Sequence, residues 1–196
     1  MATTPIVVVM GVSGSGKTTV GPLLAGRLGW PYAEADDFHP ESNVAKMAAG
    51  KPLDDDDRAP WLAAIARWIA EQQDRGEPGV VSCSALKRKY RDVLRDGRPG
   101  VLVVYLDGSR ELIERRMVAR HGHFMKAEML AGQFADLEPP DPDEAAVSVS
   151  IDGTPGEIVD EIIRVVGPEL GLGAAADPAA ADSAAADPAT ADPGGQ

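Results

Sequence analysis

The sequence predicts an α/β fold, a three-layer sandwich in which a central parallel sheet of about five strands lies between two layers of helices. Two observations predict this architecture. Short β-rich runs alternate with helical stretches over residues 1–170, and strands separated by helices require crossover connections. The first run, residues 6–10 (IVVVM), is apolar throughout, which is typical of a strand buried on both faces of a parallel sheet.

The other elements follow in order along the chain. Gly29 directly after the first helical run and Pro155 near the start of the last one agree with the usual asymmetry of helix ends. Further strands are expected at residues 32–35, 80–83, 101–106 and 147–151. Helices are expected at residues 17–28, 60–73, 86–95, 109–120 and from Pro155 onward.

Composition and charge exclude several classes of protein. The 196 residues carry 19 basic and 31 acidic side chains, a formal charge of −12 at pH 7, and 44% of them are apolar, which is enough for a folded core. No apolar run approaches the ~18 residues that span a bilayer. An acidic surface repels nucleic-acid phosphates, and the single cysteine, Cys83, excludes an internal disulfide. We therefore expect a soluble cytoplasmic protein with neither a membrane nor a nucleic-acid partner.

The last part of the chain has a different composition from the rest. Residues 174–193 consist of four five-residue units rich in Ala, Asp and Pro, without any large apolar side chain. Such a segment cannot bury enough surface to offset the entropy of ordering it. We expect one folded domain over residues 1–170 and a disordered tail over residues 171–196.

A glycine-rich loop lies between the first strand and the first helix. It matches G-x-x-x-x-G-K-[ST] in full, in the strand–loop–helix context that the motif requires. Its glycines let backbone N–H groups turn toward one anion, and the helix directs its positive end to the same place. The motif predicts a P-loop NTPase fold that uses ATP and Mg²⁺, with the nucleotide held by Gly11, Val12, Ser13, Gly14, Ser15, Gly16, Lys17 and Thr18.

Three residues near this loop have expected chemical roles. Lys17 can bring its charge to the transferring phosphate, and the Thr18 hydroxyl can ligate Mg²⁺. Asp36 follows the second strand, where a carboxylate faces the ligand crevice and can take the proton of an acceptor hydroxyl. Asp37 remains an alternative base, although paired acids before a helix can also be N-caps.

The helix at 109–120 carries Arg116 and Arg120 on one face. We expect one guanidinium to contact the nucleotide base and the other, Arg120, to act catalytically by neutralising charge on the transferring phosphate. A solvated basic face balanced by nearby glutamates is the alternative. The glycine-hinged segment that follows predicts a mobile lid at about residues 121–138.

Four separated blocks, at residues 35–40, 43–62, 83–95 and 119–139, resemble the bacterial gluconokinases, and the resemblance spans residues 6–166. It implies transfer of the γ-phosphate of ATP to D-gluconate, giving 6-phosphogluconate for the pentose phosphate or Entner–Doudoroff route. It also implies a homodimer, a nucleotide-binding role for Arg116 and a lid role for Arg120. Ala35 replaces the usual glycine, and Ala-Gly at 131–132 departs from the usual serine.

D-Gluconate is a carboxylate that bears five hydroxyls, so its site needs cations and polar groups. The candidate substrate residues are Asp36, His39, Arg58, Lys87, Arg91 and His123. Four consecutive acids, at 54–57, are expected to cap the helix that starts at Pro60.

Two alternatives remain at this point. A kinase for another small acceptor, such as shikimate or a nucleoside monophosphate, would share the loop and the lid. A non-catalytic nucleotide-binding module is the second, and the combination of Lys17, Thr18 and Asp36 argues against it, because binding alone needs no base beside the γ-phosphate.

Overall fold

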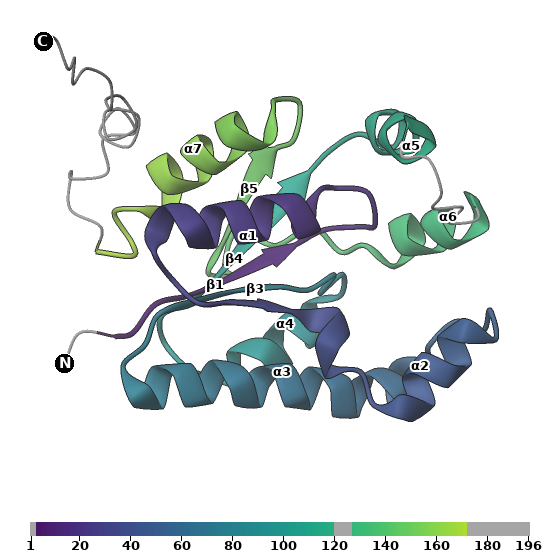
Figure 1. Ribbon diagram of the computed structural model, residues 1–196, viewed down its shortest axis with the longest axis horizontal. Helices are drawn as coiled ribbons and strands as arrows, with labels where there is room; N and C mark the ends of the chain where they lie inside the picture. Colours follow the sequence, from purple (N-terminus) through teal and green to yellow (C-terminus); the bar gives the residue numbers. More distant parts are fainter. Residues whose placement is uncertain (1–2, 120–126, 172–196) are drawn as a thin grey trace, which may run out of the picture.

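The computed structural model describes residues 3–119 and 127–171 of the chain. The described residues form one parallel sheet in the order β2-β3-β1-β4-β5, with helices on both faces (Figure 1). The α/β sandwich predicted from the sequence is therefore confirmed. The strands are β1 Ile6–Met10, β2 Tyr32–Glu34, β3 Gly79–Ser82, β4 Val101–Asp107 and β5 Ala146–Ser150.

The position of β1 at the centre of the sheet explains why its sequence is apolar throughout. Val7 and Val9 of β1 pack into the core on one face of the sheet, while Ile6, Val8 and Met10 pack into the core on the other. Because successive side chains of a strand alternate between faces, a strand covered on both sides needs apolar residues at every position. One face is covered by α1 Lys17–Leu28 and α7 Pro155–Val166, and the other by α3 Asp55–Arg75 and α4 Arg88–Arg95 (Figure 1).

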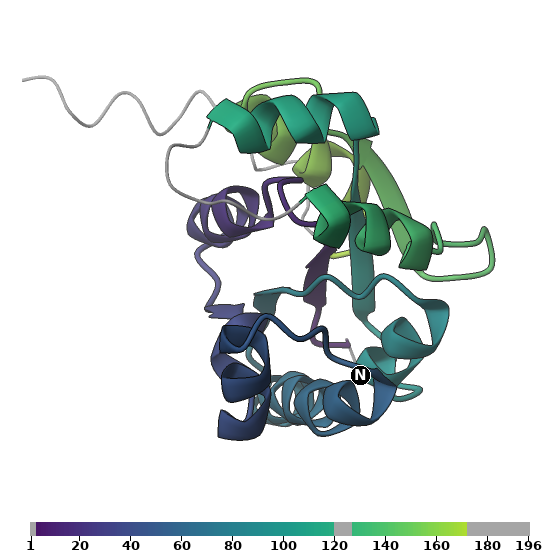
Figure 2. The same cartoon turned by 90° about the vertical axis from the view of Figure 1, so that its right-hand side faces the viewer.

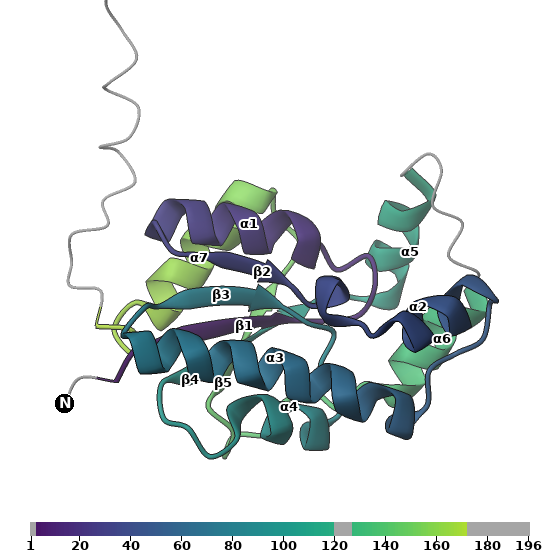
Figure 3. The same cartoon turned by 60° about the horizontal axis from the view of Figure 1, so that its bottom comes forward.

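The remaining helices gather at the carboxyl ends of the strands, to which the strand arrows point (Figure 1, Figure 3). These elements are the 3₁₀-helix η1 Ala35–Phe38 and the helices α2 Glu41–Ala48, α5 Arg110–Ala119 and α6 Ala127–Asp136. The view onto this edge shows α5 and α6 on the opposite side from α2 (Figure 2). Ligands of open parallel sheets bind at this edge.

The start of α3 corrects the sequence prediction. The helix begins at Asp55 and not at Pro60, which lies inside it. Asp54 is the N-cap: its carboxylate accepts from the backbone N–H of Asp57, whose own carboxylate accepts from the N–H of Asp54. This reciprocal capping box satisfies two N–H groups that the helix end leaves without partners, so the helix extends back to the acids.

The chain ends and the expected lid fall partly outside the described residues. Residues 172–196 of the expected tail lie outside the described residues. Residues 120–126 of the expected lid region, among them Arg120 and His123, lie outside them as well. The described part of the expected lid contains α6, and α2 was not predicted from the sequence. Within the described ranges, no helix is both long and apolar enough to cross a membrane.

Candidate active site

The phosphate loop connects β1 to α1 at the centre of the carboxyl edge. Gly14 has φ +82° and Gly16 has φ +103°, backbone conformations that side chains disfavour. A Cβ atom at Gly14 would lie 2.7 Å from Met117 Cγ, so α5 packs directly on the loop. The sequence needs glycine at Gly14 both for the turn and for this close approach.

Lys17 lies at the base of the loop. Its Nζ donates to the carbonyl oxygen of Val12 at 3.1 Å, so the side chain folds back across the loop. Burial lowers the pKa of Lys17, and the negative charges of the nearby Asp36 and Glu34 act in the opposite direction. A buried ammonium with this environment is stabilised by an anion that binds beside it.

The residues present fit the phosphates of a nucleotide and its metal ion. The loop amides and Lys17 suit the phosphates, and Thr18 is exposed at the first turn of α1 with a hard oxygen that suits Mg²⁺. Among residues 3–119 and 127–171, no group of three or more His, Cys, Asp and Glu side chains could hold a metal by itself. A Mg²⁺ ion here would therefore need the phosphate oxygens as ligands as well.

Two acids, one at the end of β2 and one in the following η1, differ in how they are held. Tyr32 Oη lies 2.6 Å from Glu34 Oε2 and 3.0 Å from Ser82 Oγ, and the Ser82 hydroxyl donates to Glu34 Oε1. Burial raises the pKa of Tyr32, so its hydroxyl stays protonated and holds Glu34 in place. Asp36 is exposed in η1, and its carboxylate makes no hydrogen bond or ion pair with any described residue. Of these two carboxylates, Asp36 is the one open to a ligand.

His39 belongs to a rigid wall beside these acids. Its ring stacks on Trp61 with centroids 4.5 Å apart, and Trp61 Nε1 donates to the carbonyl oxygen of Ala35 at 2.6 Å. Asn43 Nδ2 donates to the carbonyl of Asp57 at 2.7 Å and lies 3.4 Å from His39 Nδ1. Because Nδ2 can only donate, Nδ1 accepts, and neutral His39 carries its proton on Nε2. Burial lowers the pKa of His39 and favours this neutral form.

Arg58 and Lys87, both predicted to bind the substrate, meet at the ring of Tyr90. Arg58 Nη1 donates to Tyr90 Oη at 2.9 Å, and Lys87 Nζ lies 5.8 Å from the ring centroid. Lys89 lies 5.6 Å from the same centroid, and the Tyr90 hydroxyl donates to Asp55. We call Arg58, Lys87, Lys89 and Tyr90 the Tyr90 cluster. It gathers three cations on the side of the sheet covered by α3 and α4, where Lys89 pairs with Asp55 and Lys87 with Asp136.

Arg91 does not join the Tyr90 cluster, which corrects its predicted role as a substrate ligand. Its side chain is fully buried and forms two parallel hydrogen bonds with Glu144, at 2.6 and 2.7 Å. Its Nη1 also donates to the carbonyl oxygens of Ala85, Leu86 and Glu138. With its donors used inside the protein, this guanidinium joins α4 to the segment that follows α6 and cannot reach a ligand.

One arginine of α5, Arg116, is held by backbone oxygens. Arg116 Nη2 donates to the carbonyl of Gly153 at 3.2 Å and also to that of Ile151, in the loop between β5 and α7. Met117, the next residue of α5, packs on Gly14 of the phosphate loop, whereas the Arg116 side chain is directed to the loop after β5. Arg120, predicted to act on the transferring phosphate, and His123, predicted to bind the substrate, lie outside the described residues.

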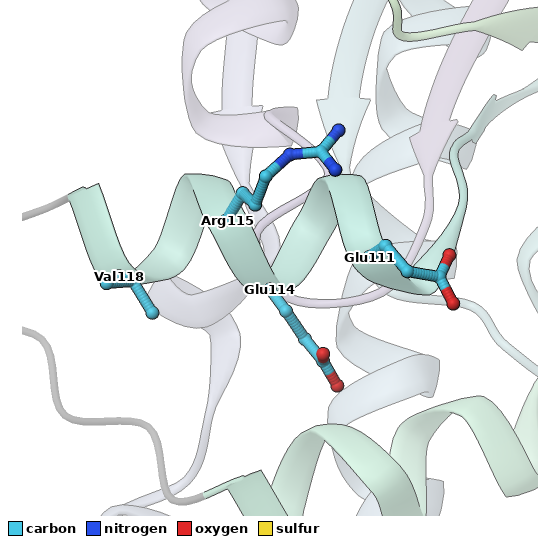
Figure 4. Close-up of a pocket in the computed structure, with 4 residues that line it drawn as sticks. All are labelled: Glu111, Glu114, Arg115 and Val118. Carbon is cyan, nitrogen blue, oxygen red and sulfur yellow. The ribbon is translucent and has the colours of Figure 1, made fainter.

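Two further features were not predicted. Gln133 of α6 contacts Ser13 of the phosphate loop through both atoms of its amide. A hollow of about 460 Å³ lies along α5, lined by Glu111, Glu114, Arg115 and Val118 (Figure 4). All four lining residues belong to α5, and none of them belongs to the phosphate loop. Cys83 is buried, and burial raises its pKa to about 12, as expected for an unreactive thiol.

The loop, the open carboxylate beside it and the sheet order together define a P-loop kinase that acts on a small molecule. Comparison with known proteins agrees: residues 13–166 match the family model described as shikimate kinase. The chain is 48% identical to the gluconokinase of Gluconobacter oxydans over 80% of this chain and 88% of that protein. It is 44% identical to the thermoresistant gluconokinase of Escherichia coli over 82% of this chain and 93% of that protein.

Solved structures give the same result. A gluconokinase from Sinorhizobium meliloti superposes with a TM-score of 0.79 and 44% identity, covering 87% of this chain and 96% of that one. The adenylylsulfate (APS) kinase of Mycobacterium tuberculosis, at a TM-score of 0.61 and 21% identity, shares the fold. The chain belongs to the shikimate kinase family and, within it, to the gluconokinases.

Proposed function

We propose that this protein transfers the γ-phosphoryl group of ATP to the 6-hydroxyl of D-gluconate. The observation that carries the proposal is an open carboxylate, Asp36, in a fold that also presents two sites with basic side chains. One is Lys17 of the phosphate loop, whose charge Asp36 influences directly. The other is the Tyr90 cluster, whose cations suit the carboxylate of a sugar acid.

The nucleotide side neutralises negative charge. Lys17 and the loop N–H groups bind the phosphates and stabilise the charge that develops as the γ-phosphoryl group leaves. Mg²⁺, when bound through Thr18 and phosphate oxygens, neutralises further charge on the same groups. In this proposal Arg116 borders the nucleotide, which is supported by the packing of α5 on the phosphate loop through Met117.

Asp36 accepts the proton of the acceptor. The acceptor oxygen forms a bond to the γ-phosphorus, the bond between that phosphorus and the β–γ bridging oxygen breaks, and ADP leaves with the bonding electron pair. The hydroxyl proton moves to the Asp36 carboxylate, which is exposed and near the Lys17 ammonium. Asp37 is the next residue in η1 and remains the alternative base.

The acceptor side selects for a carboxylate and hydroxyl groups. Arg58 and Lys87 carry the positive charge that pairs with the gluconate carboxylate, and Arg58 can form two parallel hydrogen bonds with it. His39 Nε2–H, whose ring is held by Trp61 and Asn43, donates to a hydroxyl group of D-gluconate. The relatives support gluconate over shikimate or a nucleoside monophosphate, because those at 44% and 48% identity are gluconokinases.

A coupled assay of ADP release with a panel of acceptors tests the proposal. D-Gluconate should be preferred over shikimate, AMP and D-glucitol, which replaces the carboxylate by a hydroxymethyl group. We expect a ratio of kcat/KM of about 10²-fold or more against D-glucitol, because the cations would lose their anionic partner. A better rate with shikimate or AMP would contradict the assignment, and no ADP release with any acceptor would favour the non-catalytic module.

Two variants locate the selectivity. Arg58→Met should reduce the preference for D-gluconate over D-glucitol by about 10-fold or more while leaving the KM for ATP unchanged. Arg67→Met, on the exposed face of the same helix, is the matched control and should leave the preference intact. Equal effects of the two variants would show that Arg58 does not recognise the carboxylate.

The proposal also includes Mg²⁺, a homodimer and a cytoplasmic location, as the resemblance to gluconokinases implies. Removal of Mg²⁺ by a chelator should abolish ADP release, and added Mg²⁺ should restore it. Light scattering after size-exclusion chromatography should give twice the 20.5 kDa mass of the chain. A monomer mass at working concentrations would contradict the dimer and leave the assigned reaction unaffected.

A further inference from the structure

Helix α6 has an apolar face with one polar residue in it. Leu130 and Phe134 of α6 and Leu137, directly after the helix, pack against the core at helical spacing, and Gln133 lies on the same side between them. An amide on the inward side of a helix is stable only when its polar atoms have partners. The partner of Gln133 is therefore informative.

Gln133 contacts one residue of the phosphate loop with both ends of its amide. Its Oε1 accepts from the backbone N–H of Ser13 at 2.6 Å, and its Nε2 donates to Ser13 Oγ at 3.0 Å. The two residues are 120 positions apart in the sequence. Ser13 is the third residue of the loop, so this paired contact fixes the backbone of the loop that must hold the phosphates.

The same helix also reaches the acceptor side. One turn further on, Asp136 pairs with Lys87 of the Tyr90 cluster, with Oδ1 and Nζ 3.2 Å apart. A short helix therefore contacts the phosphate loop through Gln133 and a substrate cation through Asp136. Since phosphoryl transfer depends on the relative position of donor and acceptor, a rigid element between them can set that position.

We propose that Gln133 is a positioning residue that acts through Ser13 and aligns the phosphate loop with the acceptor cations held by α6. This inference rests on the proposed kinase reaction and adds to it a residue that contacts neither the phosphorus nor the acceptor. Loss of Gln133 should misalign the two substrates without weakening the binding of either one greatly. The loss of Gln133 should therefore lower kcat and leave the KM values nearly unchanged.

Gln133→Met tests the proposal, because methionine keeps the length of the side chain and suits the apolar face of α6. At saturating ATP and D-gluconate, kcat should fall by about 10- to 100-fold, the range for a misplaced reacting group, while both KM values change less than threefold. The melting temperature should stay unchanged. Ser13→Ala keeps the N–H donor and loses only the hydroxyl contact, so its loss should be smaller, and it should add little in the Gln133→Met background.

Gln73→Met is the matched control. Gln73 Nε2 donates to the carbonyl oxygens of Thr4 and Pro99, at the opposite edge of the sheet, so this variant should lower the melting temperature and keep kcat. A kcat within twofold of wild type for Gln133→Met would overturn the proposal, as would a parallel fall of kcat and melting temperature. Failure of the proposed reaction is distinguishable, because it would appear as wild-type inactivity toward D-gluconate.

Discussion

Two inward-facing cations of this protein have opposite environments. The Arg91 guanidinium is fully buried and is matched by the Glu144 carboxylate and three backbone carbonyls. The Lys17 ammonium has a hydrogen bond to the Val12 carbonyl and, within the described ranges, no carboxylate at ion-pair distance. Glu34 and Asp36 influence it only through their charge.

The difference separates a structural cation from a binding one. Burying a charge is costly, and at Arg91 the protein itself supplies the compensating charge. At Lys17 the compensation is incomplete, so an anionic ligand gains energy by completing it. Both residues are basic and were candidate ligands in the sequence, Lys17 from a motif and Arg91 from its charge, and their partners in the structure separate their roles.

The largest expected effect on stability comes from removing the structural cation, Arg91. Arg91→Met leaves the buried Glu144 carboxylate without its partner and should lower the free energy of unfolding by about 3–5 kcal/mol. Urea denaturation followed by circular dichroism measures this. The double variant Arg91→Met with Glu144→Leu should recover most of the loss, and a single-variant loss below about 1 kcal/mol would contradict the structural role.

The same pair predicts acid sensitivity. Arg91 holds the pKa of Glu144 below its ordinary value of 4.5, so the carboxylate is charged in the folded protein at pH values where the unfolded chain begins to take up a proton. The stabilisation is complete above that ordinary value and is lost as the pH falls through the lowered one. The free energy of unfolding should therefore fall more in acid for the wild type than for the double variant, and equal falls would contradict this.

The next prediction concerns Asp36, the proposed base on the ligand side of the comparison. Asp36→Asn keeps the shape of the side chain and removes its ability to take a proton, so kcat should fall by about 10²- to 10³-fold with little change in the KM for ATP. Loose phosphoryl transition states place the effect toward the lower limit. Asp37→Asn is the control and should cost little. If Asp37→Asn loses more activity than Asp36→Asn, then Asp37 is the base.

The smallest expected effect on stability comes from an exposed ion pair, which separates the effect of burial from the effect of the distance between the charges. Arg27 and Asp160 form an ion pair at 2.6 Å, the same separation as Arg91 and Glu144, but their side chains are 37% and 46% exposed. Because water screens this pair, Asp160→Asn should change the free energy of unfolding by less than about 1 kcal/mol, and less still at high salt. A loss as large as that of Arg91→Met would show that distance decides, and burial does not.

The sequence predicted what depends on local pattern. The apolar run of β1 and the glycine loop are contiguous signals with one structural solution each, and both elements lie where they were expected. The start of α3 was misplaced because Pro60 resembles a first-turn residue, whereas the capping box of Asp54 and Asp57 sets the boundary. Propensity at one residue was weaker than two reciprocal hydrogen bonds.

Roles that depend on distant partners could not be predicted. Arg58 and Arg91 are equally basic in the sequence, and only the packing of α4 against the segment after α6 turns Arg91 inward to Glu144. The contact of Gln133 with Ser13 joins residues 120 positions apart and leaves no signal in either neighbourhood. Tertiary packing decides which polar residues have partners, and these partners assign the roles.

Lys17→Met, measured for both turnover and stability, tests the central claim most directly. If the charge of Lys17 serves a ligand and not the fold, kcat at saturating Mg·ATP and D-gluconate should fall by about 10²-fold or more, roughly 3 kcal/mol of transition-state stabilisation. The free energy of unfolding should change by no more than about 1 kcal/mol, the value of its one hydrogen bond to Val12. Near wild-type turnover, or a loss of stability as large as that expected for Arg91→Met, would contradict the account.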